Sequence, residues 1–225
     1  MGAGRGKARR AAGLGTGVAR VLGHREYRNE AGVLHRADGP ANIWRRHKKE
    51  WYINGVLHRL DGPAVEYADG TKEWWVDGEL DGIDGPAIER ADGTKEWFRD
   101  GVRDREDGPA IEYADGMEEW WSLNQRHRED GPAISGGRCE EWFWRNQRHR
   151  EGGPALKSDD GYECWYQHGK LHRVEGPAVI DAAGELEWWL EGEQVDEEAV
   201  RRRAAVARFA EVGKMKLEAP EKRIF

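Results

Sequence analysis

A Gly-Pro-Ala triplet that returns at an almost constant interval constrains the fold of this chain more than any other feature. Seven of the eight prolines belong to such triplets, namely Pro40, Pro63, Pro86, Pro109, Pro132, Pro154 and Pro177. Successive triplets are 23 residues apart, except for one interval of 22. A tandem repeat of this length predicts small supersecondary units, each of which is stable when it stacks on its neighbours.

The most complete unit, residues 55–77, has the pattern of a β-hairpin. An Asp-Gly pair lies in its middle, and Asn-Gly or Asp-Gly pairs lie at its ends. Such pairs favour type I′ turns between antiparallel strands. We therefore predict strands over 63–68 and 71–76, with the proline at the strand start, where its missing N–H costs the ladder least.

Each triplet is followed, after ten or eleven residues, by a tryptophan and then by a second aromatic residue. The first rings are Trp51, Trp74, Trp97, Trp120, Trp142, Trp165 and Trp188. The second rings are Tyr52, Trp75, Phe98, Trp121, Phe143, Tyr166 and Trp189. Because strand side chains alternate between faces, one ring of each pair faces the core and the other lies on the reverse face. Alternation does not say which ring is buried; we place the first in the core and take the second set as a candidate partner-binding aromatic face.

These observations predict an all-β chain: an elongated, twisted antiparallel sheet of about seven tandem hairpins over residues 24–195. The ends of such a sheet need protection against pairing with other strands. Residues 196–213 have the pattern of a capping α-helix, with Asp196 as N-cap and Gly213 after its last turn. A partner-binding helix is the alternative. Residues 1–23 are expected to form a disordered basic tail rich in Gly and Ala, and 214–225 a C-terminal tail.

The hairpin unit resembles the MORN repeat, and most closely its longer variant found in bacterial proteins and large DNA viruses. The shared features are the turn glycine, the aromatic pair before an Asn-Gly or Asp-Gly turn, and a glycine that opens the following strand. The resemblance covers residues 24–195. It implies a sheet of hairpins used for protein–protein contact or self-association, and it implies no catalytic residues.

The residue types that serve as catalytic groups or metal ligands in other proteins recur here in nearly every unit. A line of His or Asp precedes the triplets, at His35, His58, Asp81, Asp104, His127, His149 and His172. Strands in equivalent positions of adjacent repeats lie about 10 Å apart. Their His and Asp side chains are therefore too far apart to share a zinc ion, whose bonds to its ligands are about 2 Å long. We expect these side chains to hydrogen-bond the turn before the proline. The glutamates before the first tryptophans are expected in Arg–Glu pairs on the solvent face. The sequence thus predicts no enzyme, metal or cofactor.

Charge is distributed unevenly along the chain. The net charge is −7, while residues 1–23 carry five basic and no acidic side chains, which are Arg5, Lys7, Arg9, Arg10 and Arg20. Residues 24–195 carry −14, which disfavours binding of nucleic acid to the repeats because phosphates dominate that affinity. The basic tail is the candidate contact for acidic lipid or nucleic acid.

The cellular compartment can be predicted from targeting segments and from the pairing state of the cysteines. We find no apolar run of about 18 residues, so we expect no transmembrane segment. We also find no pattern of a secretion signal. Cys139 and Cys164 lie in equivalent strands of adjacent units, which are about 10 Å apart and beyond disulfide reach. These features predict two free thiols and an intracellular, cytoplasmic protein of bacterial or viral source.

Two functions are compatible with these residues. The first is a non-enzymatic protein–protein interaction or scaffold protein, which binds a partner or itself through the aromatic face. The alternative is a carbohydrate or small-ligand binding module that uses the same ladder of rings.

Overall fold

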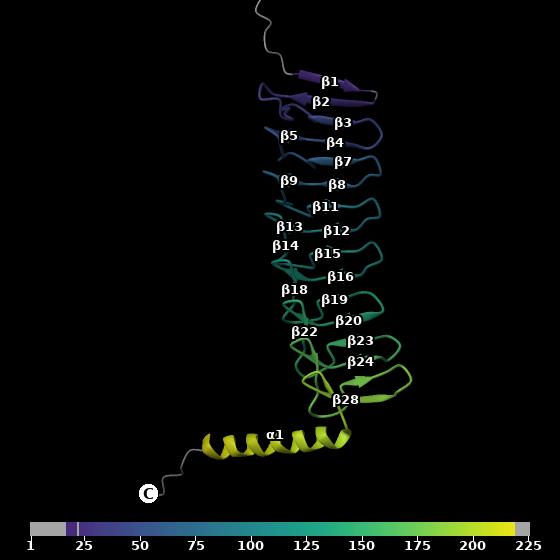
Figure 1. Cartoon of the computed structure of the whole chain (residues 1–225), viewed down its shortest axis with the longest axis vertical. Helices are drawn as coiled ribbons and strands as arrows, with labels where there is room; N and C mark the ends of the chain where they lie inside the picture. The colour runs from purple at the N-terminus through teal and green to yellow at the C-terminus, as the bar shows by residue number, and fades with distance from the viewer. Residues whose placement is uncertain (1–16, 22, 219–225) are drawn as a thin grey trace, which may run out of the picture. The chain divides into compact units, whose positions relative to one another are not determined.

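The structure, a computed structural model, describes residues 17–21 and 23–218, with side chains described over 23–209. The chain divides into two compact units, which are described separately here. The first comprises Met1–Ala91 with Arg99–Gly101, and the second comprises Asp92–Phe98 with Val102–Phe225. Both are built of short antiparallel strands (Figure 1), which confirms the predicted all-β class.

In the first unit, seven strands pair in chain order into one antiparallel ladder. They are β1 (Gly17–Val21), β2 (His24–Arg28), β3 (Asn42–Trp44), β4 (Lys48–Glu50), β7 (Val65–Tyr67), β8 (Lys72–Glu73) and β11 (Ile88–Glu89). Between the ladder strands lie two small hairpins, β5 (Tyr52–Ile53) with β6 (Val56–Leu57), and β9 (Trp75–Val76) with β10 (Glu79–Leu80). In Figure 1, β5 and β9 lie beside the ends of β4 and β8.

In the second unit, the ladder also follows chain order. Its strands are β12 (Lys95–Glu96), β15 (Ile111–Glu112), β16 (Glu118–Glu119), β19 (Ile134–Ser135), β20 (Cys139–Glu141), β23 (Leu156–Ser158), β24 (Glu163–Cys164), β27 (Val179–Ile180), β28 (Leu186–Leu190) and β29 (Glu193–Val195). The small hairpins are β17 (Trp121–Ser122) with β18 (Gln125–Arg126), β21 (Phe143–Trp144) with β22 (Gln147–Arg148), and β25 (Tyr166–Gln167) with β26 (Lys170–Leu171). The remaining strands are β13 (Phe98–Arg99), which spans the boundary of the units, and β14 (Val102–Arg103).

Each complete repeat therefore makes two hairpins, where the sequence predicted one. The predicted strand 71–76 breaks at Trp74, which lies between β8 and β9. The Trp74 N–H still donates to Ala87 O in the ladder (2.8 Å), but the carbonyl of the next residue, Trp75, accepts from the Arg59 N–H (3.1 Å). The backbone thus leaves the ladder at the first aromatic residue, and the second aromatic begins the small hairpin.

The two classes of turn also differ in geometry. Both residues of the end turns have positive φ, for example Asp77 (50°) and Gly78 (88°), as a type I′ turn requires. In the mid-unit turn, Gly70 has a positive φ of 101°, and its N–H donates to Tyr67 O (3.2 Å). This is a type I turn followed by a left-handed glycine, which corrects the predicted type I′ turn at this position.

The core of each unit is made of small side chains. The alanine of every triplet has no exposed surface, at Ala41, Ala64, Ala87, Ala110, Ala133, Ala155 and Ala178. Next to several of them lie buried aliphatic residues, namely Val65, Ile88, Ile111 and Val179. The triplet is therefore constant because its alanine lies where strands, loop and backbone meet without room for a larger side chain.

The ends differ from the sequence prediction at two boundaries. Residues 17–21, expected in the disordered tail, form β1 and pair with β2. The helix α1 (Glu197–Glu218) continues past Gly213, its predicted end. A glycine inside a helix costs about 1 kcal/mol, and the good helix formers that follow it offset this. The basic residues at positions 5–10 and the end of the C-terminal tail lie outside the described residues.

The beginning of α1 agrees with the prediction. Asp196 is the N-cap, because its Oδ1 accepts a hydrogen bond from the Ala199 N–H (2.7 Å). Val200 is buried, and the helix contacts β28 within the second unit. From Arg201 to Phe209 the side chains of α1 are largely exposed, and the helix runs away from the strands in Figure 1.

Candidate binding surface

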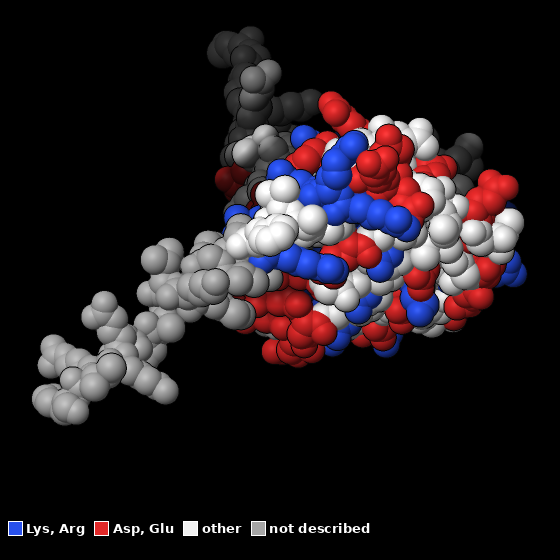
Figure 2. All heavy atoms as spheres, turned by 90° about the horizontal axis from the view of Figure 1, so that it is seen from below, with Lys and Arg blue, Asp and Glu red and all other residues white. Residues whose placement is uncertain are grey.

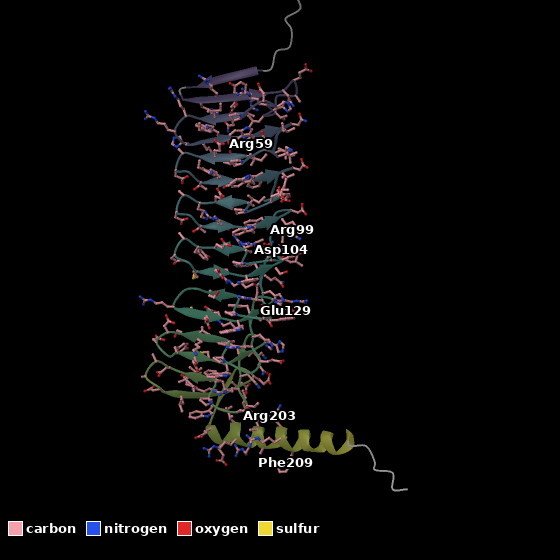
Figure 3. All side chains as sticks on the ribbon, turned by 180° about the vertical axis from the view of Figure 1, so that it is seen from behind. Arg59, Arg99, Asp104, Glu129, Arg203 and Phe209 are labelled. Atoms are coloured by element: carbon pink, nitrogen blue, oxygen red, sulfur yellow. The ribbon has the colours of Figure 1, made fainter. Side chains whose placement is uncertain are left out.

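In most repeats, the arginine before the triplet covers the first tryptophan of the preceding aromatic pair. The guanidinium carbon lies 3.7 to 4.2 Å from the ring centre in five repeats, which are Arg59 over Trp51, Arg105 over Trp97, Arg128 over Trp120, Arg150 over Trp142 and Arg173 over Trp165. Arg36 covers Tyr27 in the same way (4.3 Å). Arg59 is labelled in Figure 3. Such contacts combine cation–π attraction with stacking of the flat guanidinium.

The same guanidinium ties its loop together. Arg59 Nε donates to Asp61 Oδ1 (2.8 Å), and its Nη1 donates to Pro63 O (3.0 Å) and to Glu66 (3.4 Å). The hydrogen bond from arginine is the main reason that the pKa of the loop aspartate lies below its ordinary value at Asp38, Asp61, Asp107 and Asp130. The His-Arg-x-Asp-Gly-Pro-Ala block is thus a folded loop with its own network.

The prediction that the first tryptophans are buried in the core is wrong in the degree of their burial. Each of these rings is half-buried, and the largest side chains with almost no exposure are Val65 and Cys164. A loop rather than a second sheet covers the outer face of the ladder. Five of the seven rings therefore pack under an arginine and keep part of their surface in solvent.

The histidines and aspartates that precede the triplets form hydrogen bonds with a different turn from the predicted one. His58 Nδ1 accepts a hydrogen bond from the N–H of Asp77 (3.1 Å), in the turn of the next small hairpin. Asp81 and Asp104 accept equivalent bonds from residues 19 positions later. These side chains therefore tie each loop to the following end turn. In the 22-residue unit, His127 Nδ1 is buried and has no hydrogen-bond partner among the described residues.

Three of the six glutamates before the first tryptophans lie inside, which corrects their predicted place on the solvent face, whereas Glu187 is exposed as predicted. Glu50, Glu96 and Glu119 are 5%, 4% and 6% exposed. Glu119 accepts hydrogen bonds from the Tyr113 hydroxyl (3.0 Å) and from the Trp121 indole (2.8 Å). Strand alternation causes this, because a tryptophan turned toward the loop leaves the residue before it on the inner face.

This inner network raises the pKa of its tyrosines. Burial is the main cause, and the neighbouring carboxylates add to it, so that the pKa of Tyr67 and of Tyr113 is about 12. An unfolded tyrosine ionises near pH 10. As the pH rises from about 10 to 12, the unfolded chain therefore loses its proton first and the folded state loses stability.

We expect these two rings to titrate near pH 12 by tyrosinate absorbance, and the urea midpoint to fall over the same range. Tyr113→Phe should remove one of the late-titrating groups and reduce the slope of stability against pH. Titration of both rings near pH 10 in the folded protein would contradict this assignment.

The second aromatic rings, predicted to form an exposed partner-binding face, lie between the ladder and the small hairpins. Tyr52, Trp75, Phe98, Trp121, Tyr166 and Trp189 are half-buried. Phe143 is buried at 9% exposure, so the prediction is wrong for this ring. The indoles of Trp75, Trp121 and Trp189 each donate to the glutamate two residues earlier. The cause is the small hairpin, which folds the second ring back over that glutamate.

The largest exposed aliphatic side chains on the loops of the first unit are Leu60 and Ile83, at 67% and 62% exposure. They occupy the same position of successive loops, between the arginine site and the aspartate. Leu60 lines two pockets of the first unit, one of about 680 Å³ and one of about 270 Å³. Ile83 lines the smaller one. The sequence analysis did not single out this position, which could have been found by comparing the repeats.

The second unit has a different surface. The equivalent loop positions carry exposed glutamates in three repeats, at Glu106, Glu129 and Glu151, and the half-buried Val174 in the fourth. Seen from the end that Figure 2 shows, acidic and basic side chains are interspersed over the surface. On α1, Phe209 is 79% exposed and lies on the side of the helix away from the strands (Figure 3).

The two cysteines are separate thiols. Cys139 is half-buried in β20 and Cys164 is buried in β24, with β23 paired between these strands. Burial raises the pKa of both thiols. A raised pKa lowers the thiolate fraction at neutral pH and therefore the reactivity of both groups.

Within 17–21 and 23–218 there is no group of three or more His, Cys, Asp or Glu side chains arranged to hold a metal ion. Among the same residues, no helix has the length and apolar character needed to cross a membrane. The sequence matches no protein-family model, and a search of curated proteins returned no significant match.

Proposed function

We propose that this chain is a non-enzymatic protein-interaction or scaffold protein that binds its partner through the loops of the first unit. The observation that carries the proposal is the exposure of Leu60 and Ile83 beside two pockets. Exposed aliphatic side chains at a concave surface are typical of binding sites. Loops held by a repeated scaffold are also the usual place for binding residues.

The charged residues support a structural rather than a catalytic reading of the repeats. Histidines, loop aspartates and inner glutamates make equivalent bonds in successive units, for example His58 to Asp77 and His149 to His168. A group that has the same backbone partner in repeat after repeat holds the stack together. The resemblance to MORN repeats, which implies protein contact or self-association, favours the same function.

The test is capture of a partner by immobilised wild-type protein and by Leu60→Ser/Ile83→Ser. Leu123→Ser is the matched control, because Leu123 is 72% exposed on a hairpin turn of the second unit. We expect wild type and the control to retain the same protein, in lysate and with purified components, and the double variant to lose it.

Equal retention by the double variant would contradict the proposed surface. If light scattering shows a dimer that the double variant cannot form, the partner is a second copy of this chain. Saturable quenching of tryptophan fluorescence by a soluble glycan, without any protein partner, would favour the carbohydrate-binding alternative instead.

A further inference from the structure

The third repeat differs from the other six at one position of the arginine stack. Gly82 stands where the other repeats have Arg36, Arg59, Arg105, Arg128, Arg150 and Arg173. Trp74, the first tryptophan that precedes this loop, has no arginine over its ring within the described residues. The position lies wholly within the first unit, beside Leu60 and Ile83.

The groups that hold the guanidinium in the other repeats are kept here. In the second repeat they are the Trp51 ring, Asp61, the Pro63 carbonyl and Glu66. Their equivalents in the third repeat are Trp74, Asp84, the Pro86 carbonyl and Glu89. Asp84 is exposed and makes no hydrogen bond or ion pair with any other described residue, and Glu89 lies 3.6 Å from Lys72 Nζ.

The space for a guanidinium is open as well. In the six other repeats, a methyl group built on the glycine before the proline would lie 2.8 to 3.2 Å from the guanidinium carbon. On Gly85, the equivalent glycine, the same methyl group would meet no atom within 4 Å. This space belongs to the pocket of about 270 Å³ whose lining includes Trp74, Asp81, Asp84 and Pro86, with Arg59 of the preceding loop also at its wall. We call it the third-repeat pocket.

The loop itself keeps its own side chains out of that space. The Gly85 N–H donates to the Gly82 carbonyl (3.1 Å) and closes a tight turn. A Cβ atom at position 82 would collide with the Gly85 carbonyl oxygen and crowd the Ala87 nitrogen. In this conformation of the turn, position 82 has room only for glycine, and the turn leaves the face of Trp74 accessible from solvent.

We propose that the third-repeat pocket binds an arginine side chain of a partner protein. The guanidinium would stack on Trp74 and donate to Asp84 and to the Pro86 carbonyl, as arginine does within the other repeats. A planar fork of donors can stack and bond both oxygens at once, whereas an ammonium group cannot. The proposal rests on the proposed function, since Leu60 and Ile83 at the pocket rim would contact the segment that carries the arginine.

The direct test uses small probes on the full chain. Nα-acetyl-arginine methylamide is titrated while the indole N–H signal of Trp74, assigned with Trp74→Phe, is followed by NMR. We expect saturable binding with a Kd of about 1 mM, as is usual for a ligand of this size. The lysine analogue should bind about tenfold more weakly, and the uncharged citrulline analogue should not shift the signal.

Two variants locate the site. Asp84→Asn should weaken the arginine probe about tenfold, while Asp107→Asn, on a repeat that already holds its own arginine, should leave the affinity unchanged. Gly82→Arg places in the loop the pattern of residues 104–109, which folds over its tryptophan in the second unit, and should abolish probe binding. Equal affinity for the arginine and lysine probes, or no effect of Asp84→Asn, would overturn the proposal.

Together, the capture and titration experiments distinguish a failure of the arginine site from a failure of the proposed function. Loss of the captured partner in Gly82→Arg, and its release by the arginine probe, would support an arginine supplied by that partner. If capture depends on Leu60 and Ile83 but the probe does not bind, the protein-binding function stands and the arginine site is wrong. If the probe binds Trp74 but no protein depends on Leu60 and Ile83, the proposal fails as stated, because the ligand is then a free guanidinium compound.

Discussion

Replacing Glu119 by alanine is expected to lower the free energy of unfolding by about 3 kcal/mol, because removing one member of a buried charge network leaves the others unpaired. The carboxylate bonds the Tyr113 hydroxyl, the Trp121 indole and Arg126 Nε, the last at 3.1 Å. Its side chain is 7% exposed, while that of Arg126 is 37% exposed. Because Arg126 can turn toward water, we place the loss at the lower end of the range for buried pairs.

The neighbouring position provides the control for this measurement. Glu118 precedes Glu119 in β16, and its side chain makes no hydrogen bond within the described residues. Glu118→Ala should therefore change stability by less than about 0.5 kcal/mol. Glu119→Gln, which keeps an acceptor but loses the charge, should fall between the two. A loss below about 1 kcal/mol for Glu119→Ala in chemical denaturation would show that the inner network contributes little.

Trp97→Ala is expected to cost about 3 kcal/mol, at the lower end for truncation of a large aromatic ring. The ring is half-buried, and its face is covered by the Arg105 guanidinium at 4.0 Å. Truncation removes the apolar area between ladder and loop and also the surface on which Arg105 rests. The loss includes part of the loop network, since Arg105 also bonds Asp107 (3.1 Å) and Glu112 (2.8 Å).

A double-mutant cycle separates these contributions. Arg105→Ala alone and together with Trp97→Ala should give a coupling of about 0.5–1 kcal/mol, the range of a partly exposed cation–π pair. Trp144→Ala, at a ring that is 38% exposed, should cost about 1 kcal/mol and serves as control. Equal losses for Trp97→Ala and Trp144→Ala would show that the arginine stack does not stabilise the repeat.

Several features of this fold follow from local chemistry and could be predicted from the sequence. The end-turn pair Asp77-Gly78 forms the predicted type I′ turn, because both residues tolerate positive φ. Asp196 caps α1 through a bond to a residue three positions away. The spacing of the triplets predicted a stack of hairpins. Each of these depends on residues that are close along the chain.

The site was less predictable, because it depends on contacts between repeats. The inward position of Glu119 follows from the turn of Trp120 toward a loop that sequence alternation cannot place. The bond from His58 to Asp77 crosses 19 residues. Alternation states that two neighbouring side chains face opposite ways, and it does not state what covers each face.

By itself, the sequence determined the class of the fold, the hairpin repeat and the end turns, since these follow from backbone preferences repeated in every unit. The tertiary structure decided which aromatic ring meets an arginine and which meets a glutamate, because that choice depends on how loops and small hairpins fold over the ladder. Gly82 shows the difference: the sequence marks it as an exception to the repeat, and the structure shows an accessible tryptophan beside it.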